Sequence, residues 1–175
     1  MLLGTIAFTT SSVEARHGKR VFTGRMDGFQ EVPSISSLGH GRLWLRASRD
    51  EQVIDYKLSY SGLSIPVTQA HMHFGQPHTN GGVSVMLCQS AAVADPAALA
   101  PMCVAEGMVT GTITAEQVVG PAEQGIGAGQ IRELLRALRG RATYVNVHTE
   151  RVPSGEIPRL PFFPLRNSAF SASLR

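Results

Sequence analysis

The feature that most constrains the fold is a two-residue alternation of apolar and polar side chains that recurs in short stretches. It is clearest in QVIDYKLSY, where Ile54, Tyr56, Leu58 and Tyr60 fall on one face and polar residues fall mainly on the other. A period of two is that of a β-strand with one buried face. Eighteen glycines and ten prolines, spread through the 175 residues, supply turns between such stretches. Helix is therefore expected to be the minority.

The spacing of these stretches predicts a single all-β domain. One example is RLWLRA, where Leu43, Leu45 and Ala47 alternate with Arg42, Trp44 and Arg46. About seven strands separated by turns are typical of an antiparallel β-sandwich of the immunoglobulin-like or superoxide-dismutase-like Greek-key kind. The strands are expected at residues 21–28, 42–47, 52–60, 68–74, 82–88, 106–114 and 141–149.

One or two short helices are expected between the last strands. The stretch TAEQ, which begins at Thr114, has the spacing of a capping box and predicts a short helix. In QIRELLRALRG, apolar side chains recur at helical spacing, which predicts an amphipathic helix closed by Gly140. The apolar positions of that helix are Ile131, Leu134, Leu135 and Leu138.

The two ends of the chain lack the alternation. Residues 1–15 combine a short apolar stretch, LLGTIAF, with small residues up to Ala15, which predicts an export signal, although no basic segment precedes it. A fraying tail is the alternative interpretation. The globular domain is assigned to residues 20–158, and residues 159–175 are predicted to be a loosely held tail. No segment after the N-terminal stretch reaches the roughly 18 apolar residues of a membrane span.

The two cysteines flank an Ala- and Pro-rich loop. A bridge between Cys88 and Cys103 would close this loop and, in the chain-entropy model, stabilise the fold by about 3 kcal/mol. A disulfide would agree with a periplasmic or secreted location, which is oxidising. Two free buried thiols are the alternative.

Several function classes find little support. The net charge of +3 comes mainly from arginines, and Arg132, Arg136 and Arg139 follow helical spacing without interleaved aromatics, which favours a solvated helix face over a nucleic-acid surface. The sequence has no GxSxG motif, and GIGAGQ lacks the spacing of a phosphate-binding loop. We therefore assign no catalytic and no organic-cofactor residues.

Three of the six histidines fall on the polar faces of predicted strands. His71 and His73 lie two residues apart in TQAHMHF, opposite Ala70, Met72 and Phe74, so their rings point to one side of the strand. His148 lies on the polar face of RATYVNVHT. Two imidazoles at this spacing can reach one ion at about 2.0–2.1 Å, and a third can come from another strand. A pH-sensitive patch and ordinary surface histidines are the alternatives.

The sequence also suggests where the remaining histidines lie and which residues could form hydrogen bonds with the metal ligands. His17, His40 and His78 are expected to be exposed to solvent. A metal-bound histidine usually donates its second ring N–H to a carboxylate or a carbonyl. Glu156, Asn146 and Gln69 are the candidate partners.

The order of short motifs resembles that of the CHRD domain, a module named after chordin and common in secreted bacterial proteins. The resemblance covers roughly residues 20–158 and rests on FQEVP, YSGL, AHMHFG with NGG, TGTIT with AEQ, YVNVHT and PSGEI. It implies an all-β sandwich in an extracytoplasmic location. His71, His73 and His148 are the recurrent histidines of these motifs, so the resemblance supports a site for copper or zinc.

Two departures from the family pattern stand out. The family usually continues Gly-Glu-Ile with Arg-Gly, whereas Ile157 is followed by PRLPFFP, which leaves the pairing of the last strand open. The loop between the two cysteines is also longer than in the simplest members.

The leading functional hypothesis is an exported binding domain that holds one copper or zinc ion through His71, His73 and His148. The first alternative is a metal-free module that binds another extracellular protein, as chordin domains belong to a growth-factor-binding protein. A redox enzyme of the superoxide-dismutase type is a weaker alternative, because the ligand set for a second metal is missing and the fold alone does not define an activity.

Overall fold

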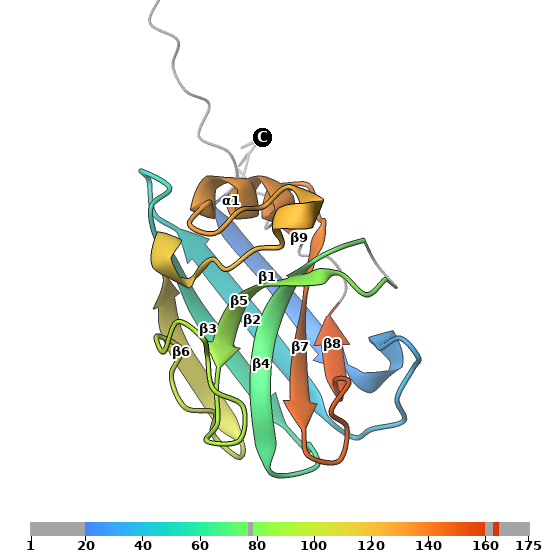
Figure 1. Cartoon of the computed structure of the whole chain (residues 1–175). Helices are drawn as coiled ribbons and strands as arrows, with labels where there is room; N and C mark the ends of the chain where they lie inside the picture. Colours follow the sequence, from blue (N-terminus) through green and yellow to red (C-terminus); the bar gives the residue numbers. More distant parts are fainter. Residues whose placement is uncertain (1–19, 77–78, 160–162, 165–175) are drawn as a thin grey trace, which may run out of the picture.

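The chain folds into two antiparallel β-sheets packed face to face (Figure 1). The structure, a computed structural model, describes residues 20–76, 79–159 and 163–164. One sheet has five strands in the order β6-β3-β2-β1-β9, and the other has four in the order β5-β4-β7-β8. The first sheet contains β1 (Val21–Asp27), β2 (His40–Ala47), β3 (Ile54–Ser61), β6 (Gly107–Ile113) and β9 (Phe163–Pro164). The second contains β4 (Val67–Phe74), β5 (Gly82–Cys88), β7 (Thr143–Thr149) and β8 (Ile157–Arg159).

The apolar positions of the alternating stretches fill the space between the sheets. On β3, Ile54, Tyr56, Leu58 and Tyr60 are all at most 2% exposed. Across the sandwich, Met72, Val145 and Val147 of the second sheet are fully buried in the same core cluster. Burial of this kind stabilises the fold by about 25 cal/mol per Å² of apolar surface removed from water. The predicted all-β sandwich is therefore confirmed.

The helical segments between β6 and β7 lie at one end of the sandwich (Figure 1). They are the helix α1 (Ile131–Arg139) and the short 3-10 helices η2 (Ala115–Gln117) and η3 (Ala122–Gln124), while η1 (Gly28–Gln30) follows β1. The predicted apolar face of α1 is buried. At the start of η2 the backbone N–H of Thr114 donates to Gln117 Oε1 at 3.1 Å, as the capping-box spacing predicts.

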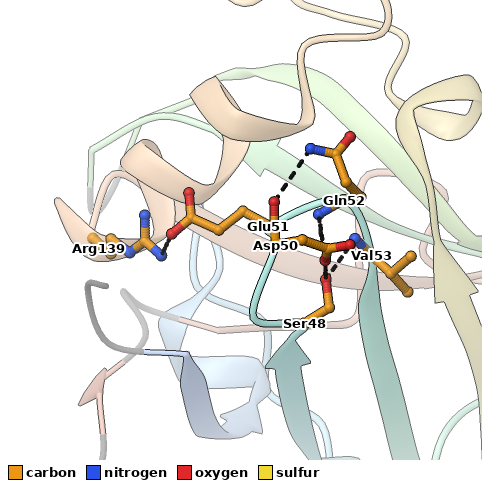
Figure 2. A network of polar contacts seen from close by, with 6 residues as sticks. All are labelled: Ser48, Asp50, Glu51, Gln52, Val53 and Arg139. Carbon is orange, nitrogen blue, oxygen red and sulfur yellow. Dashed lines mark hydrogen bonds and ion pairs between the residues drawn. The ribbon is translucent and has the colours of Figure 1, made fainter. Parts of the chain in front are cut away.

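Helix α1 is tied to the turn between β2 and β3 by a charged contact (Figure 2). Arg139 Nη2 lies 2.6 Å from Glu51 Oε1. The turn itself is held by Ser48, whose hydroxyl donates to Asp50 and accepts from the backbone N–H of Val53 at 3.1 Å. This network fixes the end of the sandwich that carries α1.

The cysteines form the predicted disulfide. Cys88, at the end of β5, is bonded to Cys103 across a sequence separation of 15 residues. Cys88 is fully buried in the core, so the bridge anchors the Ala- and Pro-rich loop to the edge of the four-stranded sheet. The alternative of two free thiols is wrong.

Strand β5 departs from the predicted alternation. Unbroken alternation would place Val83, Val85 and Leu87 together on the apolar face, but only Val85 and Leu87 join the core cluster. Register shifts in the pairing of β5 with β4 place Val83 opposite His73 and Met86 opposite His71, on the outer face of the sheet. Bulges of this kind add a residue and reverse the alternation beyond it, which a strict period of two does not anticipate.

The ends of the chain are described only in part. Residues 157–159 pair with β7 as β8, and residues 163–164 pair with β1 as β9, so the chain after PSGEI takes part in both sheets. The predicted export signal at residues 1–15 and most of the predicted tail lie outside the described residues. None of the helices in the described residues has the length and apolar composition of a membrane span.

Candidate metal centre

The three histidines come together because β4 and β7 are neighbours in the four-stranded sheet. His71 and His73 alternate with the core residues Ala70 and Met72, so their rings lie on the outer face of that sheet. The antiparallel register pairs His148 with Gln69. The next cross-strand pair on the same face of the sheet is that of His71 with Asn146. The strands therefore place His148 diagonally across from His71.

The three rings form a compact group. The ring centroids of His71 and His73 are 4.5 Å apart, and those of His71 and His148 are 4.3 Å apart. His71 and His148 are only 6% and 5% exposed, and His73 is half-buried. The rings thus lie outside the core between the sheets, as predicted, but loops cover them and keep them largely away from water.

Backbone carbonyls orient two of the rings. His73 Nδ1 lies 2.8 Å from the carbonyl oxygen of Gly81, and His148 Nδ1 lies 2.9 Å from that of Pro153. A carbonyl only accepts, so each Nδ1 carries the proton and donates it. In both rings Nε2 is then left with a free lone pair, which is the form that binds a metal ion.

Each histidine has one buried ring nitrogen without a hydrogen-bond partner. These atoms are His71 Nδ1, His73 Nε2 and His148 Nε2. One ligand nitrogen from each residue lies within 4.8 Å of those of the other two. An ion bound tetrahedrally at about 2.1 Å would hold its ligand nitrogens roughly 3.4 Å apart. The distance between any two ligand nitrogens, at most 4.8 Å, would therefore have to shorten by about 1.4 Å or less. Small ring rotations suffice for this, and the donor set fits one transition-metal ion.

Burial keeps the imidazoles neutral. The pKa of His71 is lowered to about 2, mainly by desolvation and further by the neighbouring His148 and His73. Desolvation also lowers the pKa of His73 to about 4, against the opposing effect of the Gly81 carbonyl, and lowers the pKa of His148. The folded protein therefore keeps these imidazoles neutral well below pH 6.5, which argues against a surface patch that changes charge near that pH.

Tyr144 and Gly81 support His73. The ring of Tyr144, on β7, stacks on His73 with centroids 4.6 Å apart and planes 5° from parallel. The Tyr144 hydroxyl accepts a hydrogen bond of 2.9 Å from the N–H of Gly81, whose carbonyl accepts from His73. A Cβ at Gly81 would lie 2.0 Å from the carbonyl oxygen of Phe74, so a side chain there would push the loop away. The NGG motif therefore fixes one ligand of the candidate site.

Sequence reasoning missed a buried pair beside the site. Glu31, in FQEVP, accepts a hydrogen bond of 3.1 Å from Asn146 Nδ2, and both residues are buried. Gly155 has φ +119, and a Cβ there would lie 2.5 Å from Glu31 Oε2 and 2.7 Å from Asn146 Nδ2. All three residues lie in motifs on which the family resemblance rests. The resemblance could therefore have indicated that they lie close together.

The other predicted residues fall elsewhere. His40 is exposed on β2, as expected, whereas His17 and His78 lie outside the described residues. Glu156 accepts hydrogen bonds from Ser37, Ser64 and Thr149, so it ties two loops to the end of β7. Backbone carbonyls, and not the side chains of Glu156, Asn146 or Gln69, orient His73 and His148.

The fold and the histidine group define a β-sandwich domain with a candidate metal centre on the outer face of one sheet. A family model described as the CHRD domain matches residues 22–158, which is most of the chain. The chain belongs to the CHRD domain family. Comparison with the curated proteins gives no match, and neither does comparison with the solved structures.

Proposed function

We propose that this CHRD domain is an exported protein that binds one Cu(II) or Zn(II) ion through His71, His73 and His148. The observation that carries the proposal is the histidine group itself: each of the three rings has one buried, unpaired nitrogen, and each brings one ligand nitrogen within 4.8 Å of those of the other two. A buried polar atom without a partner costs about 1–3 kcal/mol, and a bound cation would satisfy all three at once.

The chemistry of the donors favours borderline metal ions. Imidazole nitrogens suit copper and zinc better than calcium or magnesium, which prefer oxygen ligands. Where both ions are free, the order of affinities favours Cu(II) over Zn(II). The neutral state of the rings supports binding at neutral pH, because a protonated imidazole has no lone pair to offer.

The location is part of the proposal. A disulfide between Cys88 and Cys103 agrees with an oxidising compartment, either the periplasm or the extracellular space. The N-terminal stretch at residues 1–15 is proposed as the export signal. Both features agree with membership of a family that we associate with secreted proteins.

Metal titration of the purified, metal-free protein tests the site. We expect the wild type to take up one equivalent of Cu(II) or Zn(II), and His71→Ala and His148→Ala to lose that uptake. His40→Ala is the matched control, because His40 is exposed on the other sheet. Stoichiometric uptake that neither His71→Ala nor His148→Ala weakens would contradict the assignment and favour the metal-free interaction module. A superoxide assay of the loaded protein then separates binding alone from redox catalysis.

A further inference from the structure

Asn146 lies among the three histidines. It is the cross-strand partner of His71, and it is separated from His148 by one residue, so all three side chains share the outer face of the sheet. Tyr144, which stacks on His73, is the next residue of β7 on that face. Asn146 is 4% exposed, so its amide is buried at the centre of this arrangement.

Glu31 sets the orientation of the Asn146 amide. Its Oε2 accepts from Asn146 Nδ2 at 3.1 Å, and its Oε1 accepts from the N–H of Val32 at 3.0 Å. Since an ionised carboxylate only accepts, the NH₂ group of the amide must face it. The amide is thereby held in one orientation.

This orientation leaves the other end of the amide unpaired. Asn146 Oδ1 is buried and has no hydrogen-bond partner. Among the described residues, the buried unpaired side-chain atoms are this oxygen, the three imidazole nitrogens, and the hydroxyls of Ser84 and Thr143. A hydroxyl can rotate and either donate or accept, but Asn146 Oδ1 and the Nε2 atoms of His73 and His148 only accept. Acceptors cannot satisfy one another, so they require a cation or a donor between them.

We propose that Asn146 is the fourth side chain of the metal site, with Oδ1 directed to the bound ion, and that Glu31 is its positioning residue. This inference rests on the proposed function. It also narrows the ligand: three imidazoles and an amide oxygen suit a divalent ion, Cu(II) or Zn(II), and disfavour Cu(I), which prefers sulfur ligands. It further accounts for the glycine at position 155, because any side chain there would displace Glu31 or Asn146.

Electron paramagnetic resonance of the Cu(II)-loaded protein, together with Cu(II) titration, tests this inference. We expect Asn146→Ala to weaken Cu(II) binding by roughly 10- to 100-fold, as loss of a group that supports a metal site typically does, and to shift the g∥ and A∥ values of the spectrum. Thr143→Val is the matched control, because it removes another buried unpaired oxygen on β7, at a position that the site does not use. That variant should keep the wild-type spectrum and affinity.

Glu31→Gln keeps the test decisive if Asn146→Ala fails to fold. It keeps the side-chain volume but provides an NH₂ group that lets the Asn146 amide turn over, so it should weaken Cu(II) binding and alter the spectrum in the same direction. Wild-type spectra and affinities for the folded variants at positions 31 and 146, with copper lost in His148→Ala, would overturn this inference alone. Copper retained in His148→Ala would instead overturn the proposed function.

Discussion

The outer faces of the two sheets have the same alternating sequence pattern, but their residues lie in different environments. On the five-stranded sheet the outward residues Arg42, Arg46 and Lys57 are exposed, and His40 is exposed as well. On the four-stranded sheet the outward residues His71, Asn146 and His148 are at most 6% exposed. Alternation alone decides that a residue points away from the core, and the loops decide whether it meets water.

The covering loops also supply the polar groups that orient the site. Gly81 and Pro153 offer carbonyls to His73 and His148, and Glu31 holds Asn146. On the other face, His40 is exposed, and its ring nitrogens lie 3.0 Å from the Ser61 hydroxyl and 3.2 Å from the Leu38 carbonyl oxygen. A polar residue that a loop has covered must find a partner in the protein or in a ligand, because an unpaired buried group is costly. This difference makes only one of the two faces a candidate site.

The largest expected difference between the faces is in metal-dependent stability. A ligand that binds only the folded state at 1,000 times its Kd stabilises it by about 4.1 kcal/mol. Thermal unfolding with and without Zn(II) should therefore show a higher Tm for the wild type and for His40→Ala, and no such rise for His148→Ala. An equal rise in all three proteins would place the ion elsewhere.

The next effect is a loss of stability in acid for the metal-free protein. Unfolded imidazoles bind protons below pH 6.5, whereas the folded pKa is about 2 for His71 and about 4 for His73. The unfolded state therefore binds more protons, and stability is complete above pH 6.5 and falls as the pH approaches 4. From pH 7.5 to 5.5, each of these two residues should remove about 1.4 kcal/mol.

Urea unfolding at the two pH values measures this loss. Stability that stays level between pH 7.5 and 5.5 would mean that the histidines of the four-stranded sheet are solvated like His40.

A smaller effect is expected when the support of His73 is removed. Tyr144→Leu abolishes the stacking on His73 and the acceptor for the N–H of Gly81, so metal affinity should fall about tenfold. Tyr144→Phe keeps the ring, so its metal affinity should fall less. Isothermal titration with Zn(II) compares the two variants, and unchanged affinity in Tyr144→Leu would show that the stacking does not hold the ligand.

The smallest effect is expected on the exposed outer face of the five-stranded sheet, the solvated face. Lys57 Nζ lies 5.6 Å from the ring centroid of Trp44, an exposed cation–π contact of the kind that contributes about 0.5–1 kcal/mol. Lys57→Ala should lower the free energy of unfolding by no more than that and leave metal affinity unchanged. A change in metal affinity would mean that the two faces are coupled through the core.

The sequence predicted the parts of this comparison that depend on local periodicity. The alternation in β3 and β7 and the HxH of β4 placed each side chain on its correct face, and the family motifs grouped the three histidines. The adjacency of β4 and β7 could not be derived, because about seventy residues separate Phe74 from Thr143 and sheet pairing over such a distance is non-local.

Other features depend on details that a single-sequence pattern does not contain. The bulges in β5 turn Val83 to the outer face, whereas unbroken alternation would place it with Val85 and Leu87. The burial of the histidines arises from the loops around Glu31, Gly81 and Pro153, whose paths are set by tertiary contacts. The same loops supply the partners that we had sought among Glu156, Asn146 and Gln69.

Anomalous diffraction from crystals of the copper-loaded protein would show directly whether one ion binds between His71, His73 and His148. Data collected on both sides of the copper absorption edge locate the ion without assumptions about its ligands. We expect one strong peak at about 2.0–2.1 Å from His71 Nδ1, His73 Nε2 and His148 Nε2. A peak at His40 or elsewhere on the solvated face, with none between β4 and β7, would contradict it.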